Sequence, residues 1–155
     1  MIWKAAALLA AAIALATPAW AQTVVANDPN SIVQALQAAG YRAELKTDEF
    51  GDPQIDSAAS GSNFSIFFFD CTDHRDCGAI QFHASYEMDV PAAERIAEWN
   101  RTKRYGRAFV SRHNHTTMEM DILLDPGGIS RELFLSNLEL WTTLQGEFEE
   151  HVGWE

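Results

Sequence analysis

Positive charge is scarce in this 155-residue chain. It has 11 Lys and Arg residues against 22 Asp and Glu residues, which gives a formal net charge of −11 at pH 7. A surface this acidic repels the phosphate backbone of nucleic acids and the anionic surface of a membrane. The charge therefore argues against nucleic-acid binding and leaves a cationic or apolar partner as the expectation.

The chain also lacks a hydrophobic run long enough to span a membrane. Its longest apolar stretch, Ala5 to Ala16, falls short of the about 20 residues that a spanning helix needs. Lys4 precedes this stretch, and Ala19-Trp20-Ala21 follows with small residues at the two positions read by signal peptidase. We therefore expect residues 1–21 to be a signal peptide cleaved after Ala21. Residues 22–155 are expected to be one domain in the periplasm, with no membrane insertion after cleavage.

Signatures of catalysis are absent from the sequence. It contains no Gly-x-Ser-x-Gly elbow, glycine-rich phosphate loop or His-Glu-x-x-His motif. Glu119 and Asp121 lie two residues apart in an expected strand and so share one face, where two solvated carboxylates need no chemical role. The sequence predicts a protein that is not an enzyme and binds no cofactor.

Cysteine is limited to Cys71 and Cys77. In an exported chain, a cysteine pair that flanks one loop predicts a disulfide, which would stabilise the fold by roughly 2–2.5 kcal/mol. Further possible metal ligands crowd the same loop: Asp70, Asp73, His74 and Asp76. Zinc prefers thiolates at shorter spacing, and calcium loops need a fixed register of oxygen ligands that is missing here. The disulfide is therefore favoured, and no metal is expected.

The most apolar stretch after the leader, Asn63 to Tyr86, surrounds this loop. Its first arm is rich in phenylalanine, and its second arm has apolar residues at alternate positions: Ile80, Phe82, Ala84 and Tyr86. Two strands this apolar are expected in the middle of a sheet, with helices on at least one face.

The remaining elements follow from caps and periodicity. Asp28 is expected to cap a helix that starts at Pro29 and ends at Gly40. Further helices are expected from about residue 92 to 103 and after the cap residue Ser130. Outer strands are expected at 41–47, 54–59, 107–112 and 116–124, with a bend or bulge at 57–62. The order helix, four strands, helix, two strands, helix predicts an α+β fold with an antiparallel sheet and helices packed on one face.

Several short motifs resemble the YbjN family of bacterial proteins. They are Ala38-Ala39-Gly40-Tyr41, Trp99-Asn100-Arg101, Arg104-Tyr105-Gly106-Arg107-Ala108 and Met118-Glu119-Met120-Asp121, followed by Gly127-Gly128 and an acidic last helix. The resemblance covers nearly all of the chain after the leader. It implies a small acidic domain similar in fold to type III secretion chaperones, often paired, which binds a partner rather than transforming a substrate. It also implies a link to the regulation of sensory transduction.

The first arm of the apolar hairpin has aromatic residues at consecutive positions. If its even-numbered residues lie beneath the helices, Phe67 and Phe69 point to the opposite face. Their neighbours on that face are polar: Gln81, His83 and Ser85. Two explanations remain open, cover by the N-terminal segment Val24-Val25 or an apolar patch that binds a second copy or an extended client segment. The second is favoured, which makes Phe67 and Phe69 partner-binding candidates and a homodimer one expected form.

Basic residues cluster in one part of the chain: Arg101, Lys103, Arg104, Arg107 and Arg112. A solvated face paired with nearby carboxylates is the favoured interpretation. The functional alternative is a site for an anionic partner, with Arg101, Arg104 and Arg107 as partner-binding candidates.

His113-Asn114-His115 is expected to form a polar hairpin tip, although two histidines spaced in this way can also bind a transition metal weakly. Together these features predict a non-catalytic protein-binding or chaperone-like module that binds a protein or peptide. The alternative function is a small envelope metal-binding protein or hydrolase that uses the Cys71–Cys77 loop and His113 with His115.

Overall fold

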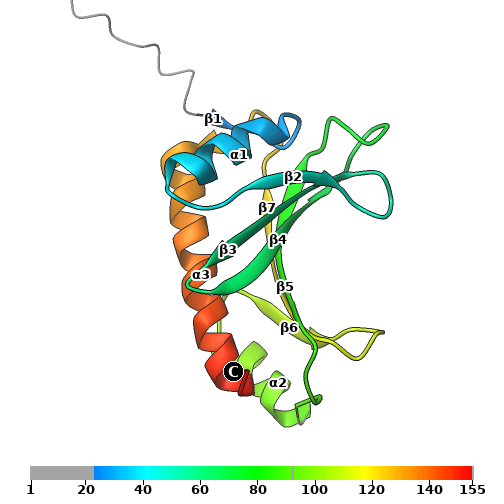
Figure 1. Ribbon diagram of the computed structural model, residues 1–155, viewed down its shortest axis with the longest axis vertical. Coiled ribbons are helices and arrows are strands. Elements are labelled where there is room, and N and C mark those ends of the chain that lie inside the picture. Colours follow the sequence, from blue (N-terminus) through cyan, green and yellow to red (C-terminus); the bar gives the residue numbers. More distant parts are fainter. Residues whose placement is uncertain (1–22, 92, 155) are drawn as a thin grey trace, which may run out of the picture.

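The computed structural model describes residues 23–91 and 93–154, whose arrangement is shown in Figure 1. The helices are α1 (Pro29–Ala38), α2 (Ala93–Thr102) and α3 (Arg131–Val152). The strands are β1 (Thr23–Val24), β2 (Glu44–Thr47), β3 (Pro53–Ala59), β4 (Ser62–Phe69), β5 (Ala79–Tyr86), β6 (Arg107–Val110), β7 (Thr116–Leu123) and β8 (Ile129–Ser130). The expected α+β class is confirmed.

The main sheet has six strands in the order β2-β3-β4-β5-β7-β6, and all neighbouring strands are antiparallel. Strands β4 and β5 therefore lie in the middle, as the apolar composition of this hairpin predicts. Strands β1 and β8 form a separate antiparallel pair. This pair was not predicted, because a strand of two residues leaves no alternating pattern in the sequence.

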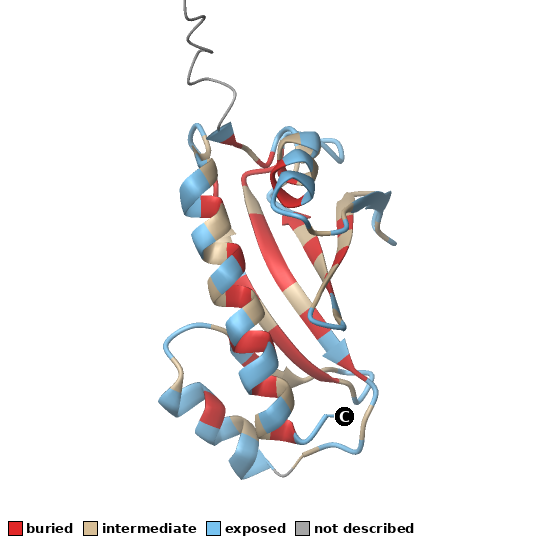
Figure 2. Cartoon of the chain, turned by 60° about the vertical axis from the view of Figure 1, so that its left-hand side comes forward, coloured by how far each residue is buried: buried red, intermediate tan, exposed pale blue. Residues whose placement is uncertain are grey.

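Helix α3 covers one face of the main sheet, and Figure 2 shows its buried positions facing the strands. There the ring of Trp141 stacks on Phe82 with ring centroids 5.6 Å apart and meets Phe64 edge-on at 6.2 Å. Helices α1 and α2 add Leu36 and Trp99 to the same buried core. The helices thus pack on one face of the sheet, as predicted.

The helix ends follow from local side chains. Asp28 Oδ1 accepts a hydrogen bond from the Asn30 backbone N–H at 3.1 Å, and Ser130 Oγ accepts one from the Leu133 N–H at 3.2 Å. These bonds satisfy N–H groups that have no partner in the first turn of a helix. Gly40, which follows the C-cap residue Ala39 of α1, has a φ of 88° that favours glycine.

Of the bend or bulge expected at residues 57–62, the structure shows a sharp turn at Ser60 and Gly61 and no bulge. Strand β3 pairs with β4 in continuous register as far as Ala59 opposite Ser62. Ser60 and Gly61 make the connection with φ values of 51° and 93°, a two-residue hairpin turn whose twist matches that of the flanking strands. The small Ser57 is fully buried, and its Oγ donates to the Arg42 carbonyl at 2.7 Å, which explains a polar residue inside the strand.

The expected signal peptide, residues 1–21, lies outside the described residues. None of the helices in the described part of the chain is long and apolar enough to cross a membrane.

Candidate functional site

The face of the main sheet opposite α3, called here the open face, carries the alternate residues that do not enter the helix-covered core. Three rows of paired residues cross it: Gln54, Phe67, Gln81 and Asp121; Asp56, Ser65, His83, Glu119 and Arg107; and Phe69, Ala79 and Leu123. The first two rows are mostly polar, whereas the third is apolar. The strand register therefore places Phe67 and Phe69 on the face opposite the helix-covered core, as predicted.

An apolar patch lies where the open face meets the end of β4. It consists of Phe50, Phe67, Phe69 and Leu123. Phe69 is 45% exposed, Leu123 is 68% exposed and Phe50 in the β2–β3 turn is 70% exposed, whereas Phe67 is half-buried. Exposed aromatic and aliphatic side chains gathered in one place are typical of interaction surfaces.

The N-terminal segment does not cover this patch. Val24 is buried in the helix-side core, and Val25 N–H donates to Ser31 Oγ in α1 at 3.1 Å. The first described residues therefore lie on the helix side of the sheet. Of the two explanations left open, cover of Phe67 and Phe69 by Val24-Val25 is therefore ruled out, because β1 pairs with β8 beside α1 and α3.

A pocket of about 440 Å³ lies between the β2–β3 turn and the open face, and residues of both line it. It is called the phenylalanine pocket here, and it is lined by Asp48, Glu49, Phe50, Gln54, Phe67, Phe69, Gln81, His83 and Glu119. Phe50 and Leu123 were missed from the sequence. Phe50 enters the site because its turn folds over the sheet, and no sequence period reports such a contact. Leu123 could have been found, because it shares the odd-numbered side of its strand with Glu119 and Asp121.

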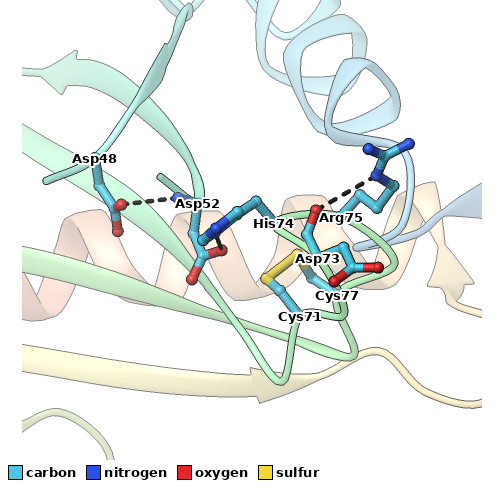
Figure 3. The surroundings of a disulfide bond; sticks show 7 residues. All are labelled: Asp48, Asp52, Cys71, Asp73, His74, Arg75 and Cys77. Atoms are coloured by element: carbon cyan, nitrogen blue, oxygen red, sulfur yellow. Dashed lines mark hydrogen bonds and ion pairs between the residues drawn. A yellow bond between two sulfur atoms is a disulfide. The ribbon is translucent and has the colours of Figure 1, made fainter. Parts of the chain in front are cut away.

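The turn that carries Phe50 is held from both sides. Asp48 Oδ1 accepts hydrogen bonds from the N–H groups of Phe50 at 2.8 Å and of Asp52 at 2.9 Å. His74 Nδ1 in the disulfide-closed loop lies 2.9 Å from Asp52 Oδ1, and Figure 3 shows this link between the two loops. A Cβ at Gly51 would lie 3.1 Å from the His74 ring, so the turn and the ring are closely packed.

The predicted disulfide between Cys71 and Cys77 is present (Figure 3). Inside its loop, Thr72 and Arg75 pair through their backbones, and Asp73, His74 and Asp76 turn the chain with positive φ, as Asp70 does just before the loop. The competing metal site is not supported. Both sulfur atoms are oxidised, and no group of three or more His, Cys, Asp or Glu residues within 23–91 and 93–154 could hold a metal ion. The loop instead supports the wall of the phenylalanine pocket.

His83 lies at the centre of the open face. Its ring meets Phe67 edge-on with centroids 5.2 Å apart, and its Nε2 is 4.0 Å from Glu119 Oε1. Burial lowers the pKa of His83, and the carboxylate of Glu119 opposes this effect without overcoming it. The imidazole is therefore neutral at pH 7, while Glu119 keeps an ion pair with Arg107.

Asp56 forms a second polar centre, nearer the β2 edge. Its carboxylate accepts hydrogen bonds from Lys46 Nζ at 2.7 Å, Gln54 Nε2 at 2.6 Å and Ser65 Oγ at 2.9 Å. Burial raises the pKa of Asp56, but the bonds from these three donors outweigh it, and the pKa lies below its usual value. The arrangement is a satisfied polar network without an obvious chemical role.

The basic cluster divides into paired and unpaired residues. Lys103 Nζ lies 2.6 Å from Glu147 Oε2 and 5.2 Å from the centroid of the Trp99 ring, and Arg112 Nε donates to His113 Nε2 at 3.1 Å. Arg101 and Arg104 are exposed, and neither makes an ion pair within the described residues. They lie in and just after α2, which packs against the C-terminal end of α3 through Arg95 and His151. The structure does not bring them together with Phe67 and Phe69.

Two residues of the Trp99-Asn100-Arg101 motif have structural roles. Trp99 Nε1 donates to the Gly106 carbonyl at 2.8 Å. The Asn100 side chain makes two hydrogen bonds with the backbone of Ala108, at 2.8 and 2.9 Å. These bonds fix α2 against β6 and satisfy backbone groups that would otherwise lack partners.

The two histidines of the β6–β7 tip do not converge on one point. The ring centroids of His113 and His115 are 6.4 Å apart, and His115 Nε2 lies 3.8 Å from Glu87 Oε1. Asn114 turns the chain with a φ of 60°. The predicted polar hairpin tip is confirmed, and the described residues around it do not assemble a metal centre.

The described residues form a small α+β domain that carries an apolar patch beside a disulfide-closed loop. The sequence profile of the YbjN family, described as "Putative bacterial sensory transduction regulator", matches residues 28–154. The chain therefore belongs to the YbjN family. No curated protein and no solved structure matches it significantly. The expected likeness to type III secretion chaperones stays a prediction.

Proposed function

We propose that this protein is a non-catalytic binding module of the bacterial periplasm. Its open face would hold an extended segment of a partner protein, with Phe67 and Phe69 in contact with that segment. The family description, which names a regulator and no enzymatic activity, supports a binding role. The disulfide is compatible with an oxidising compartment outside the cytoplasm.

The observation that carries the proposal is the exposure of the apolar patch on a face without helices. The fold gains nothing from leaving Phe50, Phe69 and Leu123 in water, because apolar side chains stabilise a protein only when they are removed from solvent. A partner segment that covers them would gain roughly 25 cal/mol for each Å² of apolar surface buried. The family description adds a regulatory context in which the partner is a component of a sensory system.

A second copy of the chain is the less favoured occupant. A symmetric pair formed through the apolar patch would gather Asp48 and Glu49 of both copies in one interface, because both copies use the same surface. Such an arrangement sets like charges against each other in a chain whose net charge is −11. Sedimentation of the wild type and of Phe67→Asp tests self-association directly. If the wild type is a dimer that the Phe67→Asp substitution dissociates, the occupant of the open face is a second copy of the chain and not a partner protein.

Site-specific photo-crosslinking tests the proposal itself. A photoreactive phenylalanine analogue at position 69 should crosslink to one identified partner in intact cells. The same analogue at Leu133, which is 52% exposed on α3, serves as the matched control. The purified partner should then bind the wild type and lose at least about tenfold in affinity towards Phe69→Asp, because a charge would replace a ring that the partner covers. Equal crosslinking from both positions, or unchanged affinity of the variant, would refute the proposed face.

A further inference from the structure

The phenylalanine pocket lies beside a second hollow of about 520 Å³ on the open face. The two share Gln54, Phe67 and His83 in their linings. A chain lying across the open face can therefore place one side chain in the phenylalanine pocket while its neighbours continue over β3 and β4. This geometry suits an extended segment better than an isolated small molecule.

The charges around the phenylalanine pocket have one sign. Three carboxylates line it, those of Asp48, Glu49 and Glu119, and its described lining contains neither lysine nor arginine. Arg107 neutralises Glu119 from the side of β6, and Asp48 already accepts two backbone hydrogen bonds. The side chain of Glu49 has no hydrogen bond or ion pair within the described residues, so its charge is available to a ligand.

The other groups near the pocket do not reverse this sign. His83 is neutral at pH 7 because burial lowers its pKa. Lys46 lies opposite Gln54, in the same row of the open face as Phe67, but it is engaged by Asp56 at 2.7 Å and by Glu44 at 3.7 Å. Asp121 accepts a hydrogen bond from Gln81 and adds a further negative charge on the same face. The pocket therefore has a negative potential and no cation of its own.

Aromatic rings complete the lining. Phe50, Phe67 and Phe69 contribute three of the nine lining residues. The faces of such rings attract cations, and the methylene groups of arginine or lysine pack on apolar surface while the charged head reaches a carboxylate. Rings and carboxylates around one pocket thus favour a side chain that is apolar along its length and positive at its end.

We propose that the phenylalanine pocket binds the arginine or lysine side chain of an extended partner segment, with Glu49 as its charge partner and Phe50 as the ring that covers it. This proposal rests on the proposed function and specifies the chemistry of the partner. The segment that it requires is extended and carries a basic residue at the position that enters the pocket.

Peptide pools test the charge preference without knowledge of the partner. Pools of heptapeptides, randomised except at the central residue, are incubated with the immobilised protein, its disulfide intact. The central residue is arginine, lysine, citrulline, norleucine or glutamate. We expect the arginine and lysine pools to be retained about tenfold more than the citrulline and norleucine pools, and the glutamate pool to be retained least. Citrulline keeps the shape of arginine and removes its charge, so equal retention of these two pools would overturn the proposal.

Two surface variants locate the effect. Glu49→Gln should reduce the preference for arginine over citrulline to about threefold or less, and Phe50→Ala should lower retention of both cationic pools. Glu139→Gln, which removes a carboxylate from the exposed side of α3, is the matched control and should behave as the wild type. An unchanged preference in Glu49→Gln would place the cation elsewhere and overturn the assignment.

The outcomes separate this inference from the proposed function. Retention of every pool without charge preference, lost in Phe69→Asp, would leave the open face as a binding surface and refute the cationic side chain. Retention of no pool would refute the inference, while the crosslinking experiment at position 69 would still decide the proposed function. Displacement of the arginine pool by free spermidine at micromolar concentration would show that a soluble polyamine is the ligand and that no partner segment is needed.

Discussion

Strand β4 presents phenylalanine to both faces of one sheet, and the solvent exposure of the ring differs between the two faces. Phe68 is 2% exposed and lies in the core under the helices, whereas its neighbour Phe69 is 45% exposed on the open face. The residue type and the strand are the same, so only the environment differs. The comparison teaches that one face of the sheet accounts for folding, and that the aromatic residues of the other face need a separate explanation.

The largest expected effect sharpens this comparison within two adjacent residues. Phe68→Ala should lower the free energy of unfolding by about 3–5 kcal/mol, because it removes a buried ring and leaves a cavity. Phe69→Ala should change it by no more than about 0.5 kcal/mol, as expected for an exposed side chain. Urea unfolding followed by circular dichroism measures both values. Similar losses in the two variants would show that Phe69 supports the fold and would remove it as evidence for binding.

The disulfide gives the next largest effect, because it constrains the loop that supports the open face. The double variant Cys71→Ser/Cys77→Ser should lose roughly 2–2.5 kcal/mol of stability, since the unfolded chain regains the entropy of an open loop of about seven residues. Amide hydrogen exchange in the turn from Asp48 to Asp52 should also become faster, because His74 is no longer held against it. Wild-type protein treated with reductant is the control and should match the variant. Unchanged exchange in the turn would separate the disulfide from the phenylalanine pocket.

The smallest expected effect depends on pH. Burial lowers the pKa of His83 below its ordinary value of 6.5, so the unfolded chain binds the proton more readily than the folded protein. The stability contributed by the neutral ring is complete above pH 6.5 and is lost as the pH falls below that value towards the folded pKa. His83→Gln should therefore flatten the pH dependence of the unfolding free energy between pH 6.5 and about 5, above the range in which ordinary carboxyl groups titrate.

Unfolding titrations at several pH values measure this difference. His113→Gln, at the exposed β6–β7 tip, is the control and should keep the wild-type slope. A wild-type slope in His83→Gln would mean that the open face does not shield this ring from water.

Much of the fold follows from residue patterns alone. The alternation of Ile80, Phe82 and Ala84 and the crowded phenylalanines of β4 predict a central hairpin with one helix-covered face, and the structure shows it. The caps Asp28 and Ser130 and the disulfide could equally be predicted, because each depends on residues close together in the sequence. The β1–β8 pair and the Ser60-Gly61 turn were not predicted, since the first depends on contacts between distant segments and the second on a backbone conformation.

For the same reason, the candidate site could be predicted from the sequence only in part. Phe67 and Phe69 follow from strand alternation, whereas Phe50 enters the site through the contact between His74 and Asp52, which joins two loops. Arg101 and Arg104 were grouped with the phenylalanines as partner-binding candidates, but α2 holds them near the C-terminal end of α3. Residue chemistry indicated the type of surface, while the packing of loops determined which residues share it.

The close approach of Gly128 to β1 has a practical consequence. A Cβ at this position would lie 2.4 Å from the Val24 carbonyl oxygen, so only glycine lets β1 settle beside β8. Thr23, opposite Ser130, is consequently held on the helix-covered side of the sheet. Coupling the protein to a bead or sensor chip through a side chain introduced at position 23 should thus orient Phe50 and Phe69 towards the solution.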